Sequence, residues 1–223
     1  MAPPPFAFNI AFTLEVNNNN NDNNNDTTIN AGGVTLTAAE LWQGIKRGGR
    51  NPNDFADYVS ACDVLSGGRK EFRRRLTLAD GAVHTPAGAT LDQDVWISDY
   101  LSVLSQTVDT GAKSTFHLSY GAAEGNTETH LFLTAMYELK LAHVQSETEE
   151  AKDIETNYTA LARGACRSAV EKIRLWKVEG KLAAWAEEDK LLDDAAEKET
   201  AGMDASASAS VSVGVGAKVR ASG

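Results

Sequence analysis

Five basic residues lie between positions 69 and 75, and one of them shares a face with apolar residues. In a strand, Arg74 would point to the same side of the sheet as Phe72 and Leu76. An inward arginine is costly unless it is paired, but inside a pocket its planar guanidinium can bind a carboxylate or an enolate. Because charged residues also protect sheet edges from aggregation, a solvated edge position is the favoured interpretation of Arg74.

Two tyrosines and a glutamate are the other candidates for chemistry. Tyr120 alternates in phase with Phe116 and Leu118, and Tyr137 lies on the apolar face of a later strand. Each phenol could therefore offer a hydrogen bond to a ligand from an apolar wall, although both are equally expected as plain wall residues. Glu138 could act as a general base in a partly dry site. Its alternation favours instead an outward charge that pairs with an arginine on an adjacent strand.

The elements that position these residues are mostly strands. Alternation of apolar and polar residues predicts seven of them, at 6–16, 69–78, 82–85, 91–98, 101–109, 114–121 and 131–144. Short turns that contain glycine or aspartate join the later six, which predicts an antiparallel meander.

Two short helices are expected after the first strand. Thr37 and Glu40 have the spacing of a capping box, so the first helix begins there, and the glycine pair that starts at Gly48 ends it. Asn51, followed by a proline, caps a second helix whose apolar spacing continues to Cys62.

A long amphipathic helix is expected over residues 147–185, because apolar residues recur there at steps of three and four. Its stripe includes the small residues Ala162, Ala165 and Ala169. A curved sheet closed by such a helix leaves space between them, and apolar strand faces would line that space.

The composition is that of an acidic globular protein of 223 residues, with 42% hydrophobic residues and a formal net charge of -10. An acidic surface repels phosphate backbones, so nucleic-acid binding is not expected. The chain lacks the pattern of a secretory signal or of a segment that could be inserted into a membrane. With only two cysteines, Cys62 and Cys166, these features indicate a cytoplasmic protein without disulfides.

Neither a metal site nor a resident cofactor is expected. The four histidines include no close ligand pair, and no Cys-x-x-Cys motif occurs. Phosphate-binding loops, dinucleotide fingerprints and nucleophile elbows are also missing from the sequence. The two thiols lack activating neighbours in sequence and are interpreted as buried structural cysteines.

Two segments of low complexity flank or interrupt the predicted domain. Residues 17–33 are rich in asparagine, which competes with its own backbone and buries little, so a disordered loop is expected there. Residues 187–223 are first charged and then dominated by small residues, which is typical of a flexible tail. The expected domain therefore spans residues 1–186.

Five segments carry a resemblance to a known family: Leu41–Arg47, Arg50–Pro52 with Phe55, Cys62–Leu65, Leu131–Thr134 and Tyr137–Leu139. They resemble the helix-grip fold of the SRPBCC superfamily, which includes START-like lipid carriers and birch-pollen-allergen-type proteins, and within it an AtaL-like branch. The resemblance implies an α+β fold: a curved antiparallel sheet of about seven strands around a long C-terminal helix, with two short helices after strand 1.

The function implied by this fold is the binding of a hydrophobic or amphipathic small molecule, such as a polyketide, sterol or lipid, in an internal pocket. A polyketide-type cyclase, aromatase or related lyase is the alternative, with Arg74, Tyr120, Tyr137 and Glu138 as candidate catalytic residues; a non-catalytic stress or interaction protein is another. Ligand identity and oligomeric state stay open. The expected pocket residues are Trp42, Phe55, Phe72, Arg74, Leu76, Trp96, Phe116, Leu118, Tyr120, Leu133, Ala135, Tyr137, Leu161, Ala165 and Ala169.

Overall fold

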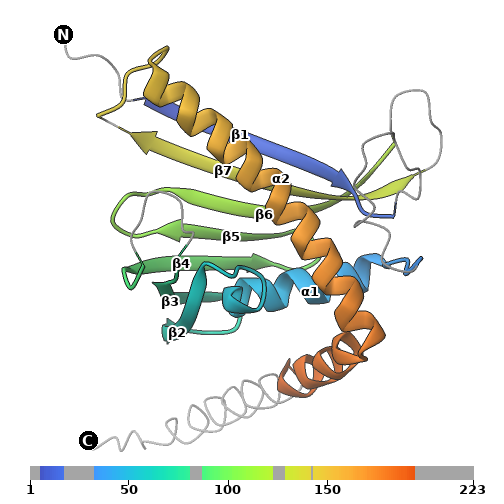
Figure 1. The fold of residues 1–223 in the computed structure, drawn as a ribbon. Coiled ribbons are helices and arrows are strands. Elements are labelled where there is room, and N and C mark those ends of the chain that lie inside the picture. The colour runs from blue at the N-terminus through green and yellow to red at the C-terminus, as the bar shows by residue number, and fades with distance from the viewer. Residues whose placement is uncertain (1–5, 18–32, 81–86, 123–128, 142, 194–223) are drawn as a thin grey trace, which may run out of the picture. The chain divides into compact units, whose positions relative to one another are not determined.

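The computed structural model describes residues 6–17, 33–80, 87–122, 129–141 and 143–193. Within them, seven strands form one curved antiparallel sheet in the order β1-β7-β6-β5-β4-β3-β2 (Figure 1). The first and the last strand in sequence are therefore neighbours. The strands are β1 (Phe6–Glu15), β2 (Val59–Gly67), β3 (Glu71–Leu78), β4 (Thr90–Ser98), β5 (Ser102–Thr107), β6 (Lys113–Gly121) and β7 (His130–Leu141).

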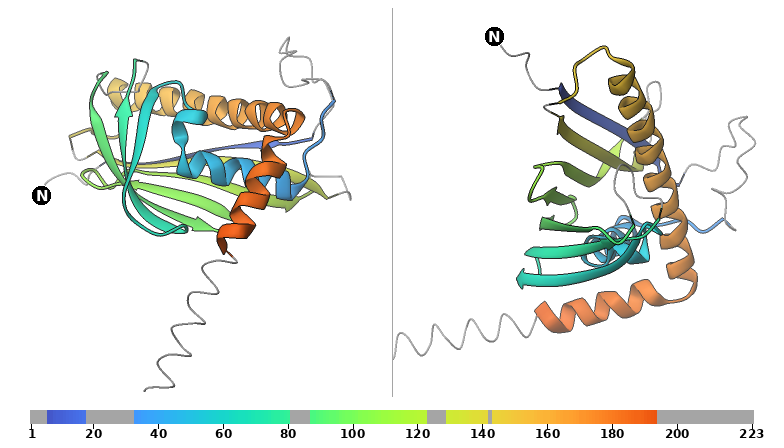
Figure 2. Two further views of the ribbon diagram at one scale, coloured as in Figure 1. Left: turned by 90° about the horizontal axis from the view of Figure 1, so that it is seen from below. Right: turned by 60° about the vertical axis from the view of Figure 1, so that its left-hand side comes forward.

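Two α-helices pack on the inner side of this sheet. The long helix α2 (Glu149–Val178) packs along β1 and β7, whereas α1 (Ala38–Arg50) contacts β4, β5 and β6 (Figure 2). A short 3-10 helix, η1 (Pro52–Asp54), follows α1. This is the α+β helix-grip arrangement that the resemblance implied, so the predicted fold class is confirmed.

The inward face of β7 follows from its sequence pattern. Every second residue from Leu131 to Leu139 is apolar, and these side chains are all 8% exposed or less. The intervening residues face the other side of the sheet. Alternation along one strand thus places the apolar residues of β7 on the core side, as predicted.

The helix predicted from Asn51 to Cys62 is wrong, because it is only three residues long and the chain then enters β2. The helix-like spacing of Val59 and Cys62 comes from a β-bulge in β2. The pairing register with β3 shifts between Val59 and Ala61, so that Val59 lies opposite Leu78 and Cys62 lies opposite Leu76. A bulge adds one residue to the alternation and gives two residues three apart the same facing.

The expected count of seven strands is reached with a different set of strands. β2 was not predicted as a strand, whereas the predicted strand at 82–85 lies outside the described residues.

The glycine pair that was expected to end α1 lies inside the helix. α1 continues to Arg50, and Asn51 is its C-cap. A Cβ atom on Gly48 would lie 2.3 Å from Cδ2 of Phe55, and one on Gly49 would lie 2.7 Å from Cγ1 of Val103. Both glycines therefore permit close packing instead of terminating the helix.

α2 is shorter than the predicted helix over residues 147–185. It begins after its N-cap Thr148, ends at Val178, and is followed by Gly180 with a φ of +74°. Residues 181–193 are helical again. The chain divides into two units, residues 1–182 and 183–223, and the sheet with α1 and α2 belongs to the first. The predicted tail lies largely outside the described residues.

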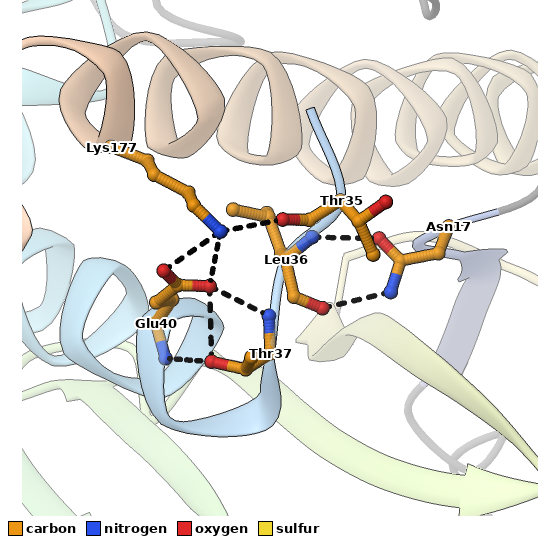
Figure 3. Close-up of polar contacts among 6 residues, drawn as sticks. All are labelled: Asn17, Thr35, Leu36, Thr37, Glu40 and Lys177. Atoms are coloured by element: carbon orange, nitrogen blue, oxygen red, sulfur yellow. Dashed lines mark hydrogen bonds and ion pairs between the residues drawn. The ribbon is translucent and has the colours of Figure 1, made fainter. Parts of the chain in front are cut away.

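A group of hydrogen-bonded residues, called the polar clasp below, joins the end of β1 to the start of α1 (Figure 3). Its members are Asn17, Thr35, Leu36, Thr37, Glu40 and Lys177. The side-chain amide of Asn17 donates to the carbonyl of Leu36 at 2.8 Å and accepts from the Leu36 amide at 2.9 Å. Asn17 is thus ordered, contrary to its assignment to a disordered loop; residues 18–32 lie outside the described residues.

The same clasp ties α1 to α2. Lys177 Nζ donates to the carbonyl of Thr35 at 2.8 Å and lies 2.8 Å from both carboxylate oxygens of Glu40. Glu40 also closes the predicted capping box, since its carboxylate accepts from the amide of Thr37 at 2.8 Å and its own amide donates to the Thr37 hydroxyl at 3.3 Å. The capping box is therefore confirmed.

Replacement of the Asn17 side chain should destabilise the fold. Asn17→Ala removes two hydrogen bonds to the Leu36 backbone, and at about 1 kcal/mol for each bond we expect a loss of about 2 kcal/mol in the free energy of unfolding. Urea denaturation followed by circular dichroism measures this loss. The matched control is Asn9→Ala on the exposed side of β1, for which we expect a change within about 0.5 kcal/mol. Equal effects of the two substitutions would contradict the role of the clasp.

Candidate ligand-binding site

Arg74 lies on the inner face of β3 and is 4% exposed. Its Nη2 donates to Oε1 of Gln93 at 2.8 Å and to Oγ of Ser105 at 3.1 Å, and its Nε donates to the same Gln93 oxygen at 3.1 Å. Its Nη1 donates to the carbonyl of Gly49 in α1. The favoured interpretation of Arg74 as a solvated edge charge is therefore wrong, and the inward alternative is correct.

The register of the sheet explains this set of acceptors. Arg74 is the cross-strand partner of Gln93 on β4, and Gln93 is in turn the partner of Thr107 on β5. Gln93 Nε2 donates to the Thr107 hydroxyl at 3.4 Å, so a polar row continues across three strands. Above this row, Gly49 has no side chain and presents its carbonyl to the guanidinium.

All of these acceptors are neutral, and in the described part of the chain no carboxylate pairs with Arg74. Burial lowers the pKa of Arg74 to about 10, so the side chain still carries its charge at neutral pH. Its sequence neighbours differ: Arg73 pairs with Asp94, and Arg75 with Asp92, on the outer face at 2.7 Å. Arg74 is thus a buried cation without an anion.

Three tyrosines lie on the inner side of the same fold. Tyr137 on β7 is 8% exposed, and its ring centroid is 5.7 Å from that of Tyr158 on α2. Tyr58 precedes β2 and lies close enough to Tyr137 and Tyr158 for electrostatic interaction with both. Burial raises the pKa of all three phenols, so each remains protonated at neutral pH.

The wall between sheet and helix is apolar and is not fully closed. Ala135 on β7 lies between Phe12 on β1 and Phe116 on β6 in the pairing register. Ala135 is 1% exposed, whereas both phenylalanines are only half-buried although they face inward. Cys166 of α2 lies against the backbone of β7, and Arg163 of α2 lies over the Phe12 ring at 5.5 Å, so the half-buried rings are the apolar contacts that this wall could offer a ligand.

A shallow hollow on α2 belongs to the surface and not to this interior. It is lined by exposed residues on the outer side of the helix: Glu155, Thr156, Thr159, Ala160 and Arg163.

Most of the expected pocket residues face inward or lie in the core between the helices and the sheet. Trp42 is 3% exposed, and the Phe55 ring packs edge-on against Trp176 with centroids 4.8 Å apart. The other residues that are buried or half-buried on the inner side are Phe72, Leu76, Phe116, Leu118, Leu133, Ala135, Leu161, Ala165 and Ala169.

Two residues that were expected to line the pocket do not lie in the buried interior. Trp96 faces outward, because its neighbours Val95 and Ile97 are the buried residues of β4. Tyr120 is 63% exposed even though Leu118, two residues earlier on the same face, is 5% exposed. The part of β6 that other elements bury thus ends between these two residues. Alternation gives the facing of a side chain, but it does not show where along a strand the burial ends.

Glu138 lies on the outer face, 3.3 Å from Lys113 on β6. The interpretation as an outward paired charge is correct, with a lysine in place of the expected arginine. On the inward faces of the described strands, no residue is a carboxylate or an imidazole.

Sequence reasoning missed Gln93 and Ser105 as partners of Arg74 and Thr107 as a partner of Gln93, and it did not single out Tyr58 or Tyr158. The available signal was that Ser105 and Thr107 lie at every second position after Val103 and therefore share its face of β5. Small hydroxyl residues on an apolar face indicate a polar row only once the neighbouring arginine is known to be inward.

Both cysteines are free thiols, and burial raises the pKa of each. Cys166 is buried and its Sγ donates to the carbonyl of Phe12 at 3.4 Å, whereas Cys62 is half-buried near Arg50. Among the described residues, no group of three His, Cys, Asp or Glu side chains could hold a metal ion. No helix in those residues is long and apolar enough to cross a membrane.

Comparison with known proteins identifies related sequences. Residues 25–180 match the model of the AtaL family, described as acetylaranotin biosynthesis cluster protein L. The protein of that name from Aspergillus terreus is 38% identical over 182 residues, which cover 81% of this chain and 96% of the relative.

Two solved structures of similar fold are aromatase/cyclases. The Zhui aromatase/cyclase from a Streptomyces species has a TM-score of 0.49 at 10% identity and covers 78% of this chain and 96% of its own. The di-domain aromatase/cyclase BexL of the BE-7585A pathway has a TM-score of 0.48 at 9% identity and covers 75% and 49%. At these values neither similarity bears on the chemistry of this chain.

Proposed function

Because this chain belongs to the AtaL family, we propose that it binds an acidic, otherwise largely apolar small molecule of a biosynthetic pathway between its sheet and α2. The observation that carries the proposal is Arg74, a cation that is 4% exposed and whose acceptors among the described residues are all neutral. The name of the relative from Aspergillus terreus places that protein in a biosynthesis cluster, which supports a metabolite as the ligand.

The energetics of Arg74 favour an anionic ligand group. Burial of a charge is costly unless an opposite charge or strong hydrogen bonds compensate for it. A carboxylate or enolate that reaches the guanidinium would supply the missing counter-charge, and hydrogen bonds to a charged group contribute about 1.5–3 kcal/mol. The apolar rings on both sides of Ala135 would contact the remainder of the ligand.

A cyclase or lyase reaction in the same site is the second proposal. Arg74 could stabilise an enolate, and protonated phenols could donate hydrogen bonds to it. Proton abstraction also needs a base, and the inward faces of the described strands carry no carboxylate or imidazole. Binding is therefore the function that these residues support best.

Native mass spectrometry of the protein purified from its own cells tests the proposal. We expect a complex with one bound small acid, which solvent extraction and high-resolution mass measurement would identify. Titration of the recombinant protein with 2-naphthoate, an apolar acid with intrinsic fluorescence, provides the second measurement. A folded protein that carries no small molecule and does not bind 2-naphthoate would contradict the proposed function.

A further inference from the structure

Three phenol groups inside the fold lack a hydrogen-bond partner among the described residues. They belong to Tyr58, Tyr137 and Tyr158, whose side chains take part in apolar packing and electrostatic interactions. Tyr137 is 8% exposed, and a hydroxyl that is buried to this degree normally has a partner. Tyr58 and Tyr158 are half-buried and Tyr137 keeps 8% of its surface exposed, so none of the three side chains is completely enclosed by the protein.

These phenols come from opposite sides of the fold. Tyr158 packs against the cluster formed by β1, β7 and the start of α2, which includes Phe8 and Leu139. Tyr58 packs against the cluster of Val59, Leu76 and Leu78 on β2 and β3 at the other edge of the sheet. The rings of Tyr137 on β7 and Tyr158 pack with their centroids 5.7 Å apart, and Tyr58 interacts electrostatically with both.

Tyr58 also interacts electrostatically with Arg74, so the phenols and the guanidinium belong to one interior region. The guanidinium uses its N–H groups on Gln93, Ser105 and Gly49, whereas the phenol hydroxyls are not used by the described chain. The interior therefore carries two polar features of different character. One is a fixed charge, and the other is a group of neutral donors.

We propose that Tyr58, Tyr137 and Tyr158 form a second polar subsite that donates hydrogen bonds to a neutral oxygen of the ligand. Together with the proposed function, on which this inference rests, the subsite defines the ligand class as an aromatic or polycyclic acid with a second oxygen, a hydroxyl or a ketone, away from its acidic group. A simple fatty acid carries no such oxygen and would leave the phenols unsatisfied.

Protonation supports the role of the phenols as donors. Burial raises the pKa of Tyr137 most strongly, and the neighbouring Tyr58 and Tyr158 raise it further. An anionic phenolate among two other phenols is thus disfavoured, and the hydroxyl hydrogens remain available to an acceptor oxygen at neutral pH.

A series of naphthoates tests the subsite. The probes are 2-naphthoate and the set of its monohydroxy derivatives, which are isomers of one another with the hydroxyl at a different free ring position. Each is titrated by calorimetry against the full chain. We expect at least one hydroxy isomer to bind about 3- to 10-fold more tightly than 2-naphthoate, which is the range for one neutral hydrogen bond. The triple variant Tyr58→Phe, Tyr137→Phe, Tyr158→Phe should reduce this ratio to about one.

The controls separate the subsite from the proposed function. Tyr100→Phe removes a phenol hydroxyl from a residue that is 62% exposed and should keep the preference for the hydroxy isomer. Circular dichroism and thermal melting confirm that each variant is folded. If 2-naphthoate binds but no hydroxy isomer gains affinity, or the gain survives in the triple variant, the subsite is overturned while the proposed function stands. If no probe binds the folded chain, the proposed function fails.

Discussion

Arg74→Gln is expected to weaken binding of 2-naphthoate by about 10- to 150-fold, because hydrogen bonds to a charged group contribute about 1.5–3 kcal/mol. The neutral probe 2-naphthol should bind the variant and the unaltered chain within about twofold, since it presents no charge to the guanidinium. Calorimetric titration of both probes measures this split. The loss is specific to the acid because Arg74 is a buried cation whose acceptors among the described residues are neutral.

Two further variants make the test of Arg74 specific. Arg74→Lys keeps the charge but loses the planar fork, so its affinity for 2-naphthoate should lie between those of the other two proteins. Arg73→Gln removes an arginine from the same strand whose guanidinium pairs with Asp94 on the outer face, and it should leave both affinities unchanged. Equal losses for Arg73→Gln and Arg74→Gln, or a loss for both probes, would show that charge at Arg74 does not select the ligand.

Gly44→Ala is expected to lower the free energy of unfolding by about 1–3 kcal/mol, the usual cost of overpacking in a core. Gly44 lies in α1 where it crosses α2, and an added Cβ would be 2.3 Å from Cγ1 and 2.6 Å from Cδ1 of Ile173. Ile173 is completely buried, so it has little freedom to move away. The cost of the clash should exceed the gain in helix propensity, which is about 1 kcal/mol for glycine to alanine. Urea denaturation measures the difference.

A double-mutant cycle identifies the cause of that loss. Ile173→Ala alone creates a cavity, at a cost of about 2–5 kcal/mol. In Gly44→Ala with Ile173→Ala, the new methyl group fills part of that cavity, so the combined loss should be smaller than the sum by about 1–3 kcal/mol. Gly164→Ala on the exposed side of α2, where nothing lies within 4 Å of the added Cβ, should stabilise the chain. Additive losses in the cycle would mean that Ile173 is not the obstacle.

The inward faces of β1 and β7 were predictable from the sequence alone. In both strands one face is apolar from end to end, and any register that buries that face is strongly preferred. Thr37 and Glu40 likewise define the start of α1, because both hydrogen bonds of a capping box form between residues three apart. Such features depend on neighbours within a few positions, which the sequence displays directly.

β2 shows why a local pattern can indicate the wrong element. Val59 and Cys62 are spaced as on a helix, but the bulge opposite β3 gives them one facing in a strand. The hydrogen bonds that hold β2 come from β3, which follows it in the chain, and they outweigh the modest helix signal of Asn51 and Pro52. The glycines of α1 were misjudged for a related reason, because their close neighbours Phe55 and Val103 are brought there by the fold.

The sequence by itself determined the helix-grip fold class, the apolar strand faces and the presence of Arg74 on one of them. Whether Arg74 is solvated or buried was decided only by the tertiary structure, since burial depends on Gly49 in α1 and Ser105 on β5. The same holds for Tyr137 on β7 and Tyr158 on α2, whose ring centroids lie 5.7 Å apart because α2 packs along β7. Periodicity reports the facing of a side chain within its own element, but which elements cover that face follows from long-range packing.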